Sequence, residues 1–248
     1  MKIIFVRHAE PDYKNNTLTE NGFKEVASLG NHYSDDDFDY VYSSPLNRAL
    51  LTAKGVIKSK EIVQLDWLKE FEGRIVIDGN KQVAWDIVPS YVNEHPEIIS
   101  HLYNDANIIK ESNVVEQIKQ IYDGFDNLLA NHGYLREKCT YKVIKPNDDT
   151  IVIFCHFCMM SILISRLFNV PYLTIALNTF CPPTGITTFV SEEREKGIAN
   201  FRMVSYGNVS HLIEDGLPIS RSGKFIDYRK WGIYDLRKNL FKKWVQHT

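Results

Sequence analysis

No stretch of this chain stays apolar for the roughly 20 residues that a membrane-spanning helix needs. Its apolar start, from Ile3 to Val6, is also too short for the hydrophobic segment of a secretion signal. Cysteine is scarce, with four residues in 248, and a chain without a secretion signal keeps such thiols reduced. We therefore expect a cytoplasmic protein with neither a disulfide framework nor a membrane partner.

An excess of one charge is missing as well. The 29 Lys and Arg residues nearly balance the 31 Asp and Glu residues, and the formal net charge is -2. Proteins that bind nucleic acid through its phosphates present a strongly basic surface, so no nucleic-acid partner is expected. The apolar content of 44% and the charged content of 24% lie near globular averages and exclude a disordered or fibrous chain.

The sequence does contain short β-rich runs that alternate with helical patterns. Two runs, KIIFV and TIVIFC, are apolar throughout, which is typical of central strands buried on both faces. The alternation predicts an α/β fold, namely a three-layer α/β/α sandwich with a mostly parallel central sheet. Strands are expected over residues 2–6, 40–42, 61–65, 150–155, 186–190 and 201–204.

Three helices have recognisable first residues. We expect Thr19 to cap the helix that follows LTENG, and Ser112 to cap a long helix that ends at Gly133. In SSPLNRALLTAKGVIKSK, Ser44 is expected as the N-cap and Pro45 as the first helical residue.

Two segments depart from this alternation within a single predicted domain of residues 1–248. Residues 73–111 mix aromatic and polar residues between a strand and a helix, which indicates an inserted lid. Residues 217–248 are rich in Lys, Arg and aromatic residues, which indicates an amphipathic C-terminal tail. The sequence predicts no oligomeric state.

Candidate functional residues follow the predicted strands. In an open α/β sheet, ligands bind in the crevice at the carboxyl ends of the strands. Four of the predicted strands are followed there by imidazole or charged side chains: Arg7 and His8, Arg48, Glu70 and Glu72, and His156. Two arginines, two histidines and a carboxylate would form a pocket for an anion, with one acid able to donate a proton.

Several of these segments resemble the histidine phosphatase superfamily, the phosphoglycerate mutase-like proteins. VRHAE is similar to the family's Arg-His-Gly-Glu signature, and LTENG to its Leu-Thr-x-x-Gly element. SSPLNRALLTA resembles the family's Ser-Ser-x-x-x-Arg-Ala-x-x-Thr-Ala helix, and LKE resembles the segment that carries its proton donor. IVIFCHF is similar to the strand that carries its second histidine, and YGNVSHL is similar to a common ending of its core. One Arg-His pair carries little information, but several elements in the right order are specific.

The resemblance implies a phosphoric monoester hydrolase of the histidine acid phosphatase type, acting on a small phosphorylated metabolite. His8 would be the nucleophile that forms a phosphohistidine, and Glu70 the general acid. Arg7, Arg48 and His156 would bind the phosphate, without a metal or another cofactor. The residue chemistry agrees, because a guanidinium group matches phosphate oxygens in two-point contacts and keeps its proton.

Simpler interpretations exist for each residue taken alone. A single histidine at a strand end, or an arginine on a helix, is usually an ordinary surface residue, and a glutamate is usually solvated. His156 between Cys155 and Cys158 could belong to a zinc site, but Cys139 and Cys181 lack suitable spacing. Glu72 is the alternative acid, and the family spacing favours Glu70.

Three departures from the family pattern leave the substrate open. Ala9 replaces the glycine after the nucleophile, and Phe157 replaces the glycine after the second histidine, placing a large ring near the pocket rim. The segment PDYKNN lacks the Thr-x-x-Asn pattern of mutases and sugar-phosphate phosphatases. The alternatives are therefore a mutase-type phosphoryl transfer and a non-catalytic phosphate-binding regulatory protein. The aromatic lid favours a ring-bearing or apolar phosphoester, unless its rings only form the lid's own core.

Overall fold

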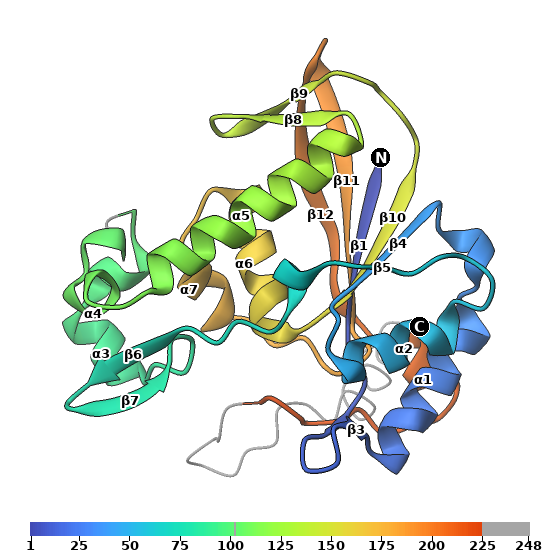
Figure 1. The fold of residues 1–248 in the computed structure, drawn as a ribbon, viewed down its shortest axis with the longest axis horizontal. Coiled ribbons are helices and arrows are strands. Elements are labelled where there is room, and N and C mark those ends of the chain that lie inside the picture. Colours follow the sequence, from blue (N-terminus) through green and yellow to red (C-terminus); the bar gives the residue numbers. More distant parts are fainter. Residues whose placement is uncertain (102, 225–248) are drawn as a thin grey trace, which may run out of the picture.

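The computed structural model describes residues 1–101 and 103–224, and its centre is an eight-stranded sheet (Figure 1). The strands are β1 (Lys2–Arg7), β4 (Tyr40–Ser43), β5 (Val63–Gln64), β8 (Tyr134–Glu137), β9 (Thr140–Val143), β10 (Thr150–Cys155), β11 (Ile186–Glu195) and β12 (Ile198–Asn208). Their order across the sheet is β5-β4-β10-β1-β11-β12-β9-β8.

Helices cover both faces of this sheet, which confirms the three-layer α/β/α prediction (Figure 1). One face carries α5 (Val114–Asn131), α6 (Phe157–Phe168) and α7 (Tyr172–Ala176), and the other carries α1 (Glu20–His32) and α2 (Asn47–Val56). A short helix, α8 (Ser210–Glu214), packs against α1. None of the helices in the described part of the chain is long and apolar enough to cross a membrane.

The central strands β1 and β10 are apolar between their ends because each of their faces packs against a helical layer. Ile3 and Phe5 of β1 belong to the core cluster beneath α5 and α6, whereas Ile4 and Val6 belong to the cluster beneath α2. The predicted bounds of β10 are exact, and β1 extends one residue further, to Arg7. The core therefore holds the ends of both strands, where the candidate residues begin.

The sheet is parallel over the half that carries those residues and antiparallel over the other half. Strands β5, β4, β10 and β1 run parallel to one another. Strands β11, β12, β9 and β8 are added antiparallel, so the expected parallel arrangement covers only one half. Two-residue turns join β8 to β9 and β11 to β12, and such short connections allow only antiparallel pairing. The β8–β9 hairpin was not predicted from the sequence.

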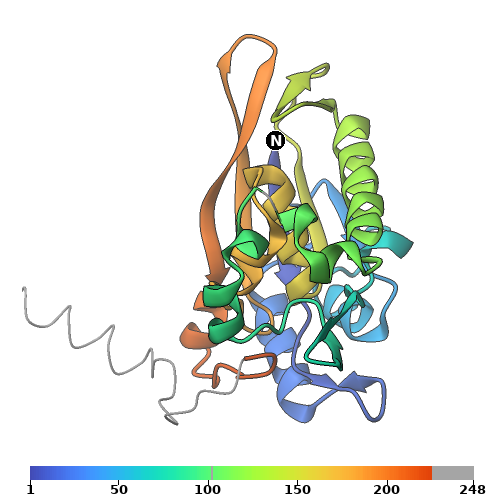
Figure 2. The same ribbon diagram turned by 90° about the vertical axis from the view of Figure 1, so that its left-hand side faces the viewer.

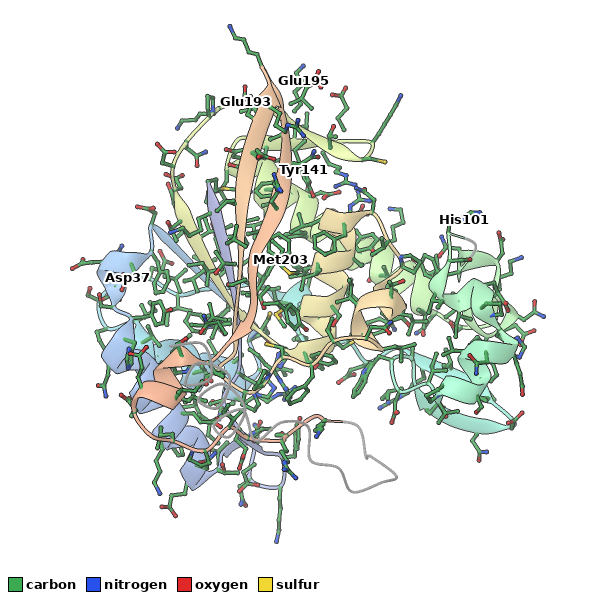
Figure 3. All side chains as sticks on the ribbon, turned by 180° about the vertical axis from the view of Figure 1, so that it is seen from behind. Asp37, His101, Tyr141, Glu193, Glu195 and Met203 are labelled. Atoms are coloured by element: carbon green, nitrogen blue, oxygen red, sulfur yellow. The ribbon has the colours of Figure 1, made fainter. Side chains whose placement is uncertain are left out.

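The β11–β12 hairpin projects beyond the rest of the sheet (Figure 2). Glu193 and Glu195 lie near its tip, at the opposite end of the molecule from the carboxyl ends of β1 and β10 (Figure 3). The functional residues are thus gathered at one end of the sheet, away from this hairpin.

The predicted helix starts have different outcomes. Thr19 is the N-cap of α1, and its hydroxyl accepts a hydrogen bond from the Gly22 amide, as predicted. The prediction for Ser44 and Pro45 was wrong, because α2 begins at Asn47 after Leu46 as its N-cap. The Ser44 hydroxyl lies 2.7 Å from Nε2 of His156 instead, a tertiary contact that the local pattern does not reveal.

The long helix α5 begins two residues after the predicted cap. Asn113 is the N-cap, while the hydroxyl of Ser112 accepts a hydrogen bond from the Val114 amide at 3.2 Å. The helix ends at Asn131, and Gly133 follows with a φ of 90°, the left-handed conformation that ends many helices.

The insertion between residues 73 and 111 folds into a hairpin and short helices on one side of the molecule (Figure 1). Its elements are β6 (Arg74–Ile77), β7 (Asn80–Val83), α3 (Pro89–Glu94) and α4 (Asn107–Lys110). Ile75, Ile98 and Ile109 are buried in the same cluster as Ile3 and Phe5 of β1. Of the predicted tail at 217–248, residues 225–248 lie outside the described residues.

Gly22 explains why LTENG is placed beside the first strand. It lies in the first turn of α1, and a Cβ atom there would overlap the carbonyl oxygen of Glu10. The same carbonyl accepts a hydrogen bond from the Thr19 amide at 3.0 Å. Only glycine allows α1 to approach the segment after β1 this closely.

We predict that Gly22→Ala destabilises the protein by about 1–3 kcal/mol, because the added methyl group overpacks against a backbone carbonyl. Helix propensity alone would give the opposite sign, by about 1 kcal/mol. The matched control is Ala27→Gly at an exposed position of α1, which should cost about 1 kcal/mol. Urea unfolding of both variants measures the two effects, and a stabilised Gly22→Ala variant would contradict the close packing.

Candidate active site

Two imidazole rings lie side by side at the carboxyl end of the parallel half of the sheet. Strands β1 and β10 pair in parallel with Arg7 opposite Cys155, and the amide of His8 donates to the Cys155 carbonyl at 2.9 Å. This register places His8 and His156 next to each other, with ring centroids 5.1 Å apart. Both side chains are buried, with 1% and 0% exposure, so the structure brings these two predicted residues together.

The His8 ring is oriented by the backbone. Its Nδ1 lies 2.7 Å from the carbonyl oxygen of Ala9. A carbonyl oxygen only accepts, so Nδ1 carries the hydrogen and Nε2 keeps its lone pair. Burial, followed by the charge of Arg7, holds the pKa of His8 well below its usual value, and Arg48 acts in the same direction. The ring is therefore neutral at pH 7, with one nucleophilic nitrogen.

The second ring, His156, precedes α6 and is its N-cap residue. Its Nε2 lies 2.7 Å from the hydroxyl oxygen of Ser44, at the end of β4. Its Nδ1 is buried and has no hydrogen-bond partner among the described residues. Burial, together with His8 and Arg48, holds the pKa of His156 well below its usual value, so this ring is neutral as well.

Arg7 and Arg48 supply the positive charge. Arg7 is buried, and its Nη1 donates to the carbonyl of Cys181 at 2.6 Å. Arg48 lies in the first turn of α2, with its guanidinium carbon 5.4 Å from the centre of the Tyr13 ring. The Nε atoms of both arginines are buried without a hydrogen-bond partner among the described residues. Because buried donors are normally paired, these nitrogens and Nδ1 of His156 suit an anion.

Phe157 lies beneath the arginine rather than at the rim, which corrects the expectation from the sequence. It is the first residue of α6, is 5% exposed, and has its ring centre 5.7 Å from the guanidinium carbon of Arg7. An aromatic face attracts a cation at this distance. The ring therefore helps to hold Arg7 in place.

The side chain of Glu70 lies close enough to Arg7 and Arg48 for their charges to act on it, although it comes from a different segment of the chain. Its Oε1 accepts hydrogen bonds from the amides of Phe71 at 2.9 Å and Met159 at 3.0 Å. Both bonds fall on Oε1, which leaves Oε2 as the oxygen able to carry a proton. Burial raises the pKa of Glu70, although these amides, Arg48 and Arg7 partly oppose the rise. Glu72, the alternative acid, is exposed.

Thr52, Thr184 and His211 support the site and were not singled out from the sequence. The hydroxyl of Thr52 on α2 accepts from the Ala9 amide at 3.0 Å, which holds the peptide between His8 and Ala9 in place. The amide of Thr184 donates to the Arg7 carbonyl at 3.1 Å, and its hydroxyl lies 3.0 Å from Nε2 of His211. Thr52 and His211 belong to the quoted motifs RALLTA and YGNVSHL, whereas Thr184 carries no local signal.

A buried carboxyl group, that of Glu25, lies behind the segment that follows His8. Glu25 of α1 accepts the amide of Glu10 at 2.7 Å and the side-chain amide of Asn21 at 3.0 Å. Burial raises the pKa of Glu25 to about 7. The hydrogen bond to Glu10 ties the segment after His8 to α1.

The remaining candidate ligands do not form a cluster. Across residues 1–101 and 103–224, no group of three or more His, Cys, Asp or Glu side chains is arranged to hold a metal ion. Cys155, Cys158 and Cys181 are buried free thiols, and Cys139 is exposed. Burial raises the pKa of Cys155 and Cys158, which keeps both thiols protonated.

The buried ring of His211 makes stability depend on pH. Burial lowers its pKa from 6.5 to about 4. As the pH falls, the unfolded chain therefore binds this proton before the folded protein does. The free energy of unfolding is highest above pH 6.5 and decreases by at most ~3 kcal/mol as the pH falls towards 4. His211→Gln keeps a donor for Thr184 and should remove up to one proton from the pH dependence of unfolding in this range. An unchanged slope in urea titrations would contradict this assignment.

The sequence model of the histidine phosphatase superfamily (branch 1) matches residues 3–134, which is more than half of the chain. Phosphoserine phosphatase 1 from Hydrogenobacter thermophilus is 32% identical over 106 residues. That match covers 39% of this chain and 48% of the relative, so the chain spans about half the length of this curated protein.

Solved structures share the fold. A mutant phosphoserine phosphatase from Entamoeba histolytica, in complex with phosphoserine, superposes with a TM-score of 0.57 at 21% identity, covering 85% of this chain and 98% of that chain. A mycobacterial glucosyl-3-phosphoglycerate phosphatase gives 0.53 at 14% identity, covering 84% of this chain and 99% of that chain. With the family match and this common architecture, the chain belongs to the histidine phosphatase superfamily.

Proposed function

We propose that this protein is a metal-independent phosphomonoesterase that acts through a phosphohistidine, in the class of histidine acid phosphatases. The observation that carries the proposal is the neutral His8 ring, held by the Ala9 carbonyl beside buried nitrogens of Arg7, Arg48 and His156 that find no hydrogen-bond partner within residues 1–101 and 103–224. Membership of the histidine phosphatase superfamily supports phosphatase activity. The whole chain, residues 1–248, is one domain in this proposal, with residues 73–111 as its lid.

Binding and attack use these groups directly. The two guanidinium groups and Nδ1 of His156 bind the non-bridging oxygens of the phosphate, since charge stabilisation and positioning dominate phosphoryl transfer. Nε2 of His8 attacks the phosphorus, and the bond to the ester oxygen breaks. Oε2 of Glu70 gives its proton to the departing oxygen, so an alcohol leaves and the phosphoryl group stays on His8.

Hydrolysis of the intermediate reverses the role of the carboxyl group. The ionised Glu70 takes a proton from water as that water attacks the phosphorus. The bond from phosphorus to Nε2 breaks, inorganic phosphate leaves, and His8 and protonated Glu70 are restored. Each step transfers one phosphoryl group and one proton, and neither step requires an oxidant or a reductant.

The substrate in this proposal is a small phosphorylated metabolite. A relative with the same fold was solved with phosphoserine and another with 3-phosphoglyceric acid, and both ligands belong to this class. The alternative of a non-catalytic phosphate-binding protein rested on Phe157 and on the uncertain identity of the acid. The position of Phe157 beneath Arg7 and the raised pKa of Glu70 both favour the enzyme in this proposal.

Substitution of the nucleophile and the acid tests this function. We expect His8→Ala to abolish hydrolysis of phosphomonoesters, with wild-type activity unaffected by EDTA. Glu70→Gln should slow an alkyl phosphate by about 10²–10⁴-fold and p-nitrophenyl phosphate much less, because p-nitrophenolate leaves without a proton. The matched control is Glu72→Gln, an exposed carboxylate that should keep wild-type rates. Equal losses in both Glu variants would contradict the assignment of Glu70.

The pH profile provides a separate test. With an alkyl phosphate, kcat/KM should fall at low pH as His8 becomes protonated and at high pH as Glu70 ionises. The lowered pKa of His8 and the raised pKa of Glu70 leave a window in which a neutral ring and a protonated acid coexist. Glu70→Gln should remove the high-pH limb and keep the low-pH limb. A high-pH limb that survives in this variant would assign that limb to another group.

A further inference from the structure

A cavity of about 650 Å³ lies between the insertion, the end of α7 and the segment after α8. We propose that this cavity binds the leaving group, and that the preferred substrates are phosphomonoesters of bulky, uncharged apolar alcohols, especially ring-bearing ones. The proposal deepens the phosphatase function proposed above and rests on it.

The cavity lies beside Arg7, because two of its lining residues approach this arginine or the ring beneath it. Gly223 lines the cavity, and a Cβ atom on this residue would overlap Nη2 of Arg7. Trp85 lines it as well, and its ring centre lies 6.4 Å from that of Phe157, which packs beneath the same guanidinium. This adjacency is the basis for assigning the alcohol portion of an ester whose phosphate contacts Arg7 to the cavity.

The size of the cavity distinguishes between substrates. Pockets that enclose a whole small molecule measure about 300–1,000 Å³, and this cavity falls within that range in addition to the phosphate site. A serine or glycerate group occupies only a small part of such a space. A ring-bearing alcohol buries far more apolar surface in it, and burial of that surface is the main source of affinity.

The walls match an uncharged apolar group. Val88, Val92, Ile99 and Leu177 contribute aliphatic surface to the lining, and Trp85 contributes aromatic surface. Among the described residues, the charged lining residues Asp86 and Lys224 have opposite signs, so together they give no net attraction for a charged leaving group. Trp85 contacts Phe157 outside the insertion, so the aromatic residues of the insertion do more than form its own core.

Two primary alkyl phosphates of similar chemical reactivity test the preference. We expect the full-length protein to hydrolyse 2-phenylethyl phosphate with a kcat/KM at least tenfold above that for O-phosphoserine. Because both leaving groups are primary alkoxides, the difference reports the cavity rather than the ease of bond cleavage.

Val88→Asp places a charge at the cavity wall with little risk to the fold. Val88 is 57% exposed and is the N-cap of α3, a position that favours aspartate. This variant should lower the ratio of the two kcat/KM values at least fivefold. The matched control is Val76→Asp, because Val76 is 55% exposed in the same insertion and does not line the cavity. The control should keep the wild-type ratio.

The outcomes separate the cavity from the chemistry. Two results would overturn the cavity assignment without affecting the proposed phosphatase activity. One is equal kcat/KM values for O-phosphoserine and 2-phenylethyl phosphate, and the other is an equal effect of Val88→Asp and Val76→Asp on their ratio. Absence of hydrolysis with both esters would overturn the phosphatase instead. In that case calorimetric titration decides the cavity: tighter binding of 2-phenylethyl phosphate than of inorganic phosphate supports it, and equal binding refutes it.

Discussion

The parallel pairing of β1 with β10 is the constraint on which the rest of the site depends. Its register places Arg7 opposite Cys155, so the two histidines that follow leave the sheet together at the same end. A shift of one residue would turn every side chain of the shifted strand to the opposite face and would move the two rings apart. The register is held by two core clusters, one beneath each face of the strands, which makes the hydrophobic core the source of the geometry of the candidate site.

Burial then determines the chemistry of the groups placed there. Desolvation disfavours the charged form of every titratable group, so it lowers the pKa of His8 and His156 and raises that of Glu70. The arginines cannot lose their protons and remain the fixed positive charges. Burial therefore favours the neutral form of both rings and of Glu70, while the arginines supply the positive charge for an anion.

Backbone groups complete the site and explain several departures from the family pattern. The carbonyls of Ala9 and Cys181 hold His8 and Arg7, and amides near the start of α6 hold Glu70. A small residue such as Ala9 can replace glycine because its backbone, not its side chain, orients the ring. Phe157 is tolerated because it packs under a guanidinium group.

The sequence by itself determined the layers, the two central strands, the cap at Thr19 and the set of residues that meet in the site, because these follow from apolar periodicity, local capping and short motifs. Tertiary structure decided what those signals do not contain. Ser44 contacts His156 instead of capping α2, and Thr184 supports Arg7 from a segment distant in sequence. The antiparallel half of the sheet and the cavity between the insertion and Gly223 likewise arise only from packing. Contacts between distant segments depend on how whole layers fit together, and no local pattern records that fit.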